Sequence, residues 1–172
     1  RAQADYMGML GTVMNALCLS DFFRSANIPC EVFSAVSMEP IAKRFNRNAA
    51  VSALEEGKVV VFGGGTGSPF FTTDTTAALR ALEMNCEAVL KATKVDGIYT
   101  ADPFKDPDAK RFSTLTYDEA LNRKLAVMDA AAFSLCRDRN LPIIVLNFFE
   151  DGSLMRVLNG DFSAGTLVSS GK

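Results

Sequence analysis

Three short, mostly apolar runs separated by segments of helical periodicity constrain the fold of this chain more than any other feature. They are KVVVF (58–62), AVLKAT (88–93) and PIIVLNF (142–148), and none of them alternates apolar with polar residues. A strand without a polar face is typical of a sheet that is covered on both sides. Because helices stand between the runs, the sequence predicts an α/β three-layer sandwich with a mostly parallel central sheet.

The other expected elements are mainly helices. Apolar residues recur at helical spacing over 6–25, and we expect the methionines of this helix to pack in the core. Further helices are expected over 48–57, 74–84 and 153–158, with two more opened by Thr116 and Asp129. Short strands are expected over 30–36 and over 166–168, the second at a sheet edge. Since the chain begins on a helix, we expect N-terminal strands of the sheet to be absent from it.

Composition narrows the class of protein. A length of 172 residues suits one domain, 1–172. The 18 basic and 20 acidic residues are mixed along the chain, which argues against a nucleic-acid partner. With no bilayer-spanning stretch and no secretory signal, we expect a cytoplasmic protein without a membrane partner. The four cysteines lie far apart and are expected to be buried free thiols.

The chain has no histidine. This excludes Ser-His-Asp and Cys-His nucleophilic sites, histidine-ligated zinc and the commonest general base. Any chemistry must therefore use carboxylates, lysines, hydroxyl groups and backbone amides.

The segment GGGTGSPFFTTD (63–74) joins a predicted strand to a predicted helix. Glycines let backbone N–H groups approach an anion, the first turn of the helix adds unpaired amides, and Thr72 and Thr73 add hydroxyl donors. No G-K-[ST] sequence follows, so this is not a P-loop. Taken alone, the segment fits either an anion cradle or a tight turn.

Lys91 stands inside an apolar strand, where an ammonium is costly unless an anion or a carboxylate meets it. A cation there would suit phosphoryl transfer, and a structural ion pair is the alternative. The following segment, VDGIYTADP, offers Tyr99 as a stacking surface and Asp102 as an acceptor, although such residues also occur in ordinary turns.

Four ordered motifs carry a resemblance to a known family: DYMGML (5–10), GTGSPFFTTD (65–74), LKATKVDGIYTADP (90–103) and VMDAAAF (127–133). Together they resemble the bacterial UMP kinases, or uridylate kinases, of the amino acid kinase family. The resemblance implies transfer of the γ-phosphoryl group of ATP to UMP, with Mg²⁺ carried mainly by the nucleotide phosphates and no metal site of the protein's own. It also implies a homo-oligomer, a hexamer, with GTP and UTP as effectors.

The resemblance also assigns roles to individual residues. Asp5 would hold the UMP ribose, Lys91 would face the transferred phosphoryl group, Asp74 would orient the catalytic lysines, and Asp129 would anchor an N-terminal lysine. The UMP site would further include Thr66, Gly67, Ser68, Pro69, Phe70, Phe71, Thr72 and Thr73. The ATP site would include Thr93, Tyr99 and Asp102.

Two departures from the family pattern affect these expectations. Ser68 stands where the family usually has Asn, which puts one contact to UMP in doubt. The family's K-x-S-G strand and its G-G-G-N loop with an arginine do not occur in this sequence. Since those parts supply a catalytic lysine and much of the phosphate clamp, we expect this chain by itself to be inactive or nearly so.

Other functions remain open at this point. A kinase of the same family acting on acetylglutamate, aspartate or carbamate would also need lysines and glycine loops, although the PFFTTD sequence favours UMP. A non-catalytic relative that binds nucleotides or oxyanions is a second alternative. A structural oligomerisation module, based on the methionine-rich first helix, is a third.

Overall fold

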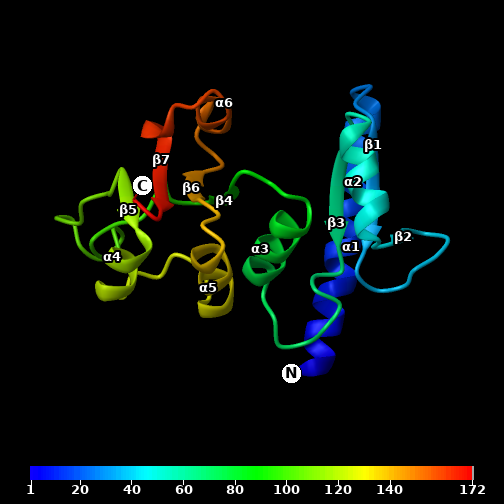
Figure 1. Cartoon of the computed structure of the whole chain (residues 1–172), viewed down its shortest axis with the longest axis horizontal. Helices are drawn as coiled ribbons and strands as arrows, with labels where there is room; N and C mark the ends of the chain where they lie inside the picture. Colours follow the sequence, from blue (N-terminus) through cyan, green and yellow to red (C-terminus); the bar gives the residue numbers. More distant parts are fainter. Residues whose placement is uncertain (172) are drawn as a thin grey trace. The chain divides into compact units, whose positions relative to one another are not determined.

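The computed structural model describes residues 1–171, which form two compact units, Arg1–Thr76 and the chain from Ala77 onward (Figure 1). The expected class is confirmed, because helices alternate with strands that pair mostly in parallel. The strands form two sheets rather than one, a three-stranded sheet in the first unit and a four-stranded sheet in the second. Among these residues, no helix combines the length and apolar character needed to cross a membrane.

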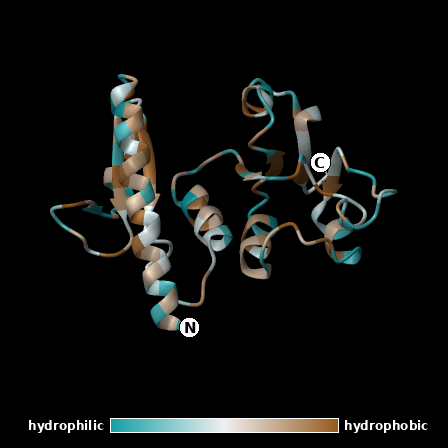
Figure 2. Ribbon diagram, turned by 180° about the vertical axis from the view of Figure 1, so that it is seen from behind, coloured by the Kyte–Doolittle hydropathy of each residue, from teal (hydrophilic) through white to brown (hydrophobic). Residues whose placement is uncertain are grey.

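The first unit is a parallel sheet of order β2-β1-β3 flanked by helices. The register pairs Phe33 with Phe62, and the small core joins Val13 of the first helix to Val32 of β1. Figure 2 shows the apolar colouring of β1 and β3, which pack against the first helix. The elements of this unit are α1 (Ala2–Ser25), β1 (Cys30–Ser34), β2 (Lys43–Arg44), α2 (Arg47–Glu55) and β3 (Val59–Gly63). Helix α3 (Thr73–Glu83) begins in the last residues of the first unit.

The first helix forms where expected, but the prediction that its methionines pack in the core is wrong for two of them. Met9 is 7% exposed, whereas Met7 is 66% and Met14 is 71% exposed. The buried stripe of α1 consists of Met9, Val13, Ala16 and Ser20, which recur every three to four residues. Val13, Ala16 and Ser20 are small or branched and allow the helix to approach the sheet closely, and the long side chains of Met7 and Met14 lie on the outer face of the helix.

The second unit has the sheet order β4-β6-β7-β5, with β6 and β7 antiparallel and the outer pairs parallel. Its larger core includes Tyr117, Phe133, Ile143 and Val168. The elements are β4 (Val89–Thr93), β5 (Thr114–Thr116), α4 (Tyr117–Asn122), α5 (Ala130–Asp138), β6 (Ile143–Asn147), α6 (Ser153–Leu158), η1 (Phe162–Ala164) and β7 (Gly165–Ser169).

The expectation that 166–168 is an edge strand is wrong. Strand β7 lies between β6 and β5, so both of its sides are paired. The outer partner of β7 is β5, which is only three residues long and follows a polar segment. Because β5 has no apolar run of its own, the sequence did not predict this strand.

Two helix starts were predicted from capping residues. Thr116 accepts a hydrogen bond from the amide of Glu119 and Asp129 accepts two from the first turn of α5, which confirms both predicted helix starts.

All four cysteines are free thiols, as expected. The expected burial is confirmed for Cys136 and is wrong for Cys18 and Cys86, which are exposed. Burial raises the pKa of the Cys136 thiol to about 11.

Candidate functional site

The first candidate site is the loop that follows β3. Gly64, Gly65 and Gly67 all have positive φ angles, between 60° and 82°, which non-glycine residues rarely adopt. A Cβ on Gly64 would lie 3.1 Å from the amide nitrogen of Ala35, directly after β1, so a side chain there would be tightly crowded. The glycine run therefore lets the backbone fold tightly against the end of the sheet.

Helix α1 holds this loop in place through two side chains. The Asp5 carboxylate accepts a hydrogen bond from the amide of Phe70 at 2.8 Å, across 65 positions of sequence. About two turns further along, the Thr12 hydroxyl accepts from the Gly64 amide at 2.9 Å and donates to the Met9 carbonyl. The loop is thus attached to α1 at both of its ends.

A cavity of about 340 Å³ lies between α1, this loop and the first turn of α3. Four of the expected UMP-site residues line it: Asp5, Phe71, Thr72 and Thr73. The others are not among its lining residues: Thr66, Gly67, Ser68, Pro69 and Phe70. Those five belong to the loop before Phe71, where Thr66 and Ser68 hydrogen-bond each other and Phe70 contacts Asp5.

The threonines at the end of the loop open helix α3. The Thr72 hydroxyl accepts from the Thr75 amide at 3.3 Å, and the Thr72 carbonyl accepts from the amide and hydroxyl of Thr76. Asp74 lies in the first turn of the helix and is not among the residues that line the cavity. Because Thr73 begins α3 and lines the cavity, the N-terminus of the helix, with its partial positive charge, borders the cavity.

The second candidate site lies in the second unit, beside the carboxyl end of β4. Lys91 is half-buried on this strand, and its ammonium donates to the Val127 carbonyl at 3.0 Å. A cavity of about 430 Å³ opens there, and all three expected ATP-site residues line it together with Lys91: Thr93, Tyr99 and Asp102. Its other walls are the segments 97–103 and 123–127.

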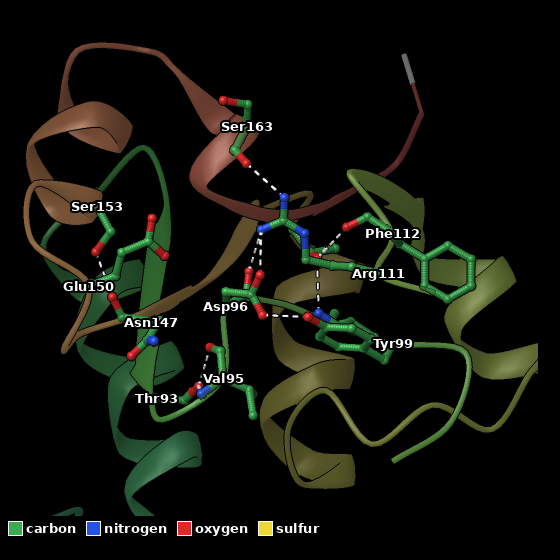
Figure 3. Close-up of polar contacts among 12 residues, drawn as sticks. Thr93, Val95, Asp96, Tyr99, Arg111, Phe112, Asn147, Glu150, Ser153 and Ser163 are labelled. Carbon is green, nitrogen blue, oxygen red and sulfur yellow. Dashed lines mark hydrogen bonds and ion pairs between the residues drawn. The ribbon is translucent and has the colours of Figure 1, made fainter. Parts of the chain in front are cut away.

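The polar residues of this site hold the loop after β4. The Thr93 hydroxyl bonds both the amide and the carbonyl of Val95, and the Tyr99 hydroxyl donates to Asp96 at 2.6 Å (Figure 3). This hydrogen bond raises the pKa of Tyr99. Asp102 accepts from the Phe104 amide at 3.0 Å and lies 3.5 Å from the Lys105 ammonium.

Asp129, the remaining expected catalytic residue, caps α5 by accepting from the amides of Ala131 and Ala132 and does not line the second cavity. The expected residues thus fall into two groups, one in each unit. Sequence reasoning assigned no role to several lining residues: Arg1, Gly8, Met9 and Thr12 in the first unit, and 123–127 in the second. Positions 5, 8, 9 and 12 share one face of a helix, so their spacing from Asp5 was an available signal.

Comparisons with known proteins identify the fold and the family of this chain. A model of the amino acid kinase family matches residues 1–147. The UMP kinase from Bacillus anthracis is similar to the chain at 40% identity and a TM-score of 0.96, over 100% of this chain and 71% of that one. The UMP kinase from Ureaplasma parvum is 35% identical, with a TM-score of 0.94, over 98% of this chain and 72% of that one. The chain belongs to the amino acid kinase family.

Proposed function

We propose that this chain is the nucleotide-binding part of a UMP kinase, which transfers the γ-phosphoryl group of ATP to UMP. The observation that carries the proposal is the cavity beside α1, where the Asp5 carboxylate, the hydroxyl groups of Thr72 and Thr73 and a helix N-terminus meet. A carboxylate suits ribose hydroxyl groups, and helix amides with hydroxyl donors suit a phosphate. Two similar proteins that are UMP kinases favour UMP over other acceptors.

The proposed chemistry needs no enzyme base. The phosphate of UMP is already an anion at neutral pH, so one of its oxygens attacks the γ-phosphorus directly while the bond to the β-phosphate oxygen breaks and ADP leaves. The protein's part is to position the two nucleotides and to balance charge on the transferred group. Lys91 is the cation proposed for that charge.

ATP is proposed to occupy the cavity of the second unit. Its volume of about 430 Å³ lies in the range of small-molecule sites, and Lys91 and Tyr99 both line it. Asp102 is the one carboxylate among its lining residues. Such a wall fits Mg²⁺ bound largely through phosphates and water, since Mg²⁺ usually takes only one or two carboxylates from the protein.

The proposed homo-oligomer is supported by apolar side chains along the outer face of α1, and the proposed stoichiometry, a hexamer, rests on the resemblance to UMP kinases. Met7, Leu10, Met14 and Phe22 are between 48% and 71% exposed and recur at helical spacing. Sedimentation velocity measures the stoichiometry directly. GTP and UTP remain proposed effectors, and a cytoplasmic location remains a proposal.

Calorimetric titration with several acceptors tests the proposed function. We expect UMP to bind, and acetylglutamate, aspartate, carbamate and molybdate not to bind. Binding of acetylglutamate or aspartate without UMP would instead assign the chain to another branch of the family. Binding of molybdate alone would favour a non-catalytic oxyanion-binding relative.

Replacing Asp5 by asparagine is expected to weaken UMP binding about ten-fold. Asparagine keeps an oxygen for the Phe70 amide, so the loop stays attached, but it loses the charge that strengthens bonds to hydroxyl groups. Calorimetry measures the change. Asp21→Asn, at an exposed position of the same helix, is the matched control and should leave UMP affinity unchanged. Equal affinities for Asp5→Asn and the wild type would contradict the role of Asp5.

A further inference from the structure

Arg111 joins three parts of the second unit without lining its cavity. Its guanidinium donates to the Asp96 carbonyl at 2.9 Å, to the Asp96 carboxylate at 3.1 Å and to the Ser163 carbonyl at 2.9 Å. Figure 3 shows the guanidinium between Ser163 and Asp96. Neither Arg111 nor Asp96 is among the residues that line the cavity, whereas Tyr99 is.

The Asp96 carboxylate links Arg111 to Tyr99 through two hydrogen bonds. One of its oxygens accepts from Arg111 and the other accepts from the Tyr99 hydroxyl at 2.6 Å. Hydrogen bonds between charged groups are stronger than those between neutral groups. The side chains of Arg111 and Asp96 are 30% and 36% exposed. The chain of contacts therefore fixes one end of a ring that forms part of the cavity wall.

The backbone around Tyr99 is held by the same segment. Tyr99 and Arg111 form an antiparallel bridge, and the Phe112 amide donates to the Ile98 carbonyl at 2.9 Å. The fully buried Thr166 hydroxyl bonds both the Ile98 amide and the Phe112 carbonyl. These contacts set the course of the loop, so a substitution at 111 that keeps the aliphatic stem leaves the backbone pairing intact.

The aliphatic stem of Arg111 packs against Gly97, at a position where a larger residue would not fit. A Cβ on Gly97 would lie 2.9 Å from Cδ of Arg111 and would also clash with the Thr166 hydroxyl. Gly97 lines the cavity whereas Arg111 does not, so the arginine packs against a residue of the cavity wall without lining the cavity itself.

We propose that Arg111 is a positioning residue for the nucleoside of ATP: through Asp96 it holds Tyr99 and the loop 96–99 in the orientation that binds the nucleotide. The inference rests on the proposed function, because it takes the second cavity as the ATP site. It adds a positioning residue that is not among the residues lining either cavity.

The test is the affinity of the whole chain for ATP and for UMP, measured by calorimetry. Arg111→Met keeps most of the stem and removes all three hydrogen bonds, so ATP binding should weaken about five- to twenty-fold while UMP binding stays unchanged. Arg111→Lys keeps the charge and should restore part of the affinity. Lys110→Met removes an exposed neighbouring charge and should leave both affinities unchanged.

The outcomes separate the inference from the proposed function. If the wild-type chain binds ATP and Arg111→Met binds it equally well, the inference is wrong and the proposed function stands. If Arg111→Met loses ATP and UMP affinity alike, Arg111 has only a general structural role and the inference is also wrong. A wild-type chain that binds no ATP would contradict the proposed function itself.

Discussion

Replacing Lys91 by methionine is expected to weaken ATP binding by about ten- to a hundred-fold, because charge-assisted hydrogen bonds to phosphate are among the strongest polar contacts. Methionine fills a similar volume on β4, so the strand should still pair with β6. The change also removes the donor to the Val127 carbonyl, in the segment 123–127 that also lines the cavity. Calorimetric titration with ATP measures the loss.

Lys94→Met provides the matched control for this prediction. Lys94 is an exposed lysine three residues further on, and it does not line the cavity. Its replacement should leave ATP affinity within about two-fold of the wild type, since exposed charges contribute little. Equal losses in the two variants would mean that net charge, rather than the position of Lys91, governs ATP binding.

Replacing Gly165 by alanine is expected to lower the free energy of unfolding by about 3 kcal/mol, at the upper end of overpacking effects. Gly165 begins β7 and pairs with Leu146 of β6, and an added Cβ would collide with the Val145 carbonyl. Because that atom is backbone in the centre of the sheet, the strands themselves must separate to accommodate it. Urea denaturation followed by circular dichroism measures the change.

Gly11→Ala is the control for Gly165→Ala. Gly11 lies inside α1, and nothing lies within 4 Å of an added Cβ. Alanine there should raise the free energy of unfolding by about 0.5–1 kcal/mol, through higher helix propensity. A Gly165→Ala protein as stable as the wild type would contradict the tight pairing of β6 with β7.

The sequence predicted those features that depend on a few neighbouring residues. Apolar runs marked β3, β4 and β6, and side-chain caps marked the starts of α4 and α5. The placement of β7 between β5 and β6 depends on pairing between segments about 20 to 50 residues apart, which no local pattern encodes. The exposure of Met14 was missed for a similar reason, since helical spacing alone does not say which face meets the sheet.

The candidate site shows the same division. The glycine loop and Lys91 are recognisable because a run of glycines and a lysine inside an apolar strand are both unusual locally. Thr12 contributes through a hydrogen bond to Gly64, 52 positions away, and Arg111 through contacts with Asp96 and Ser163. Neither residue stands out in its own segment, so only the folded chain identifies them.

A crystal structure of the chain with UMP would show directly whether the cavity beside α1 binds this nucleotide. We expect the phosphate within hydrogen-bonding distance of Thr72 or Thr73 at the start of α3, and the ribose beside the Asp5 carboxylate. A UMP phosphate bound anywhere else, including the cavity beside Lys91, would contradict this expectation.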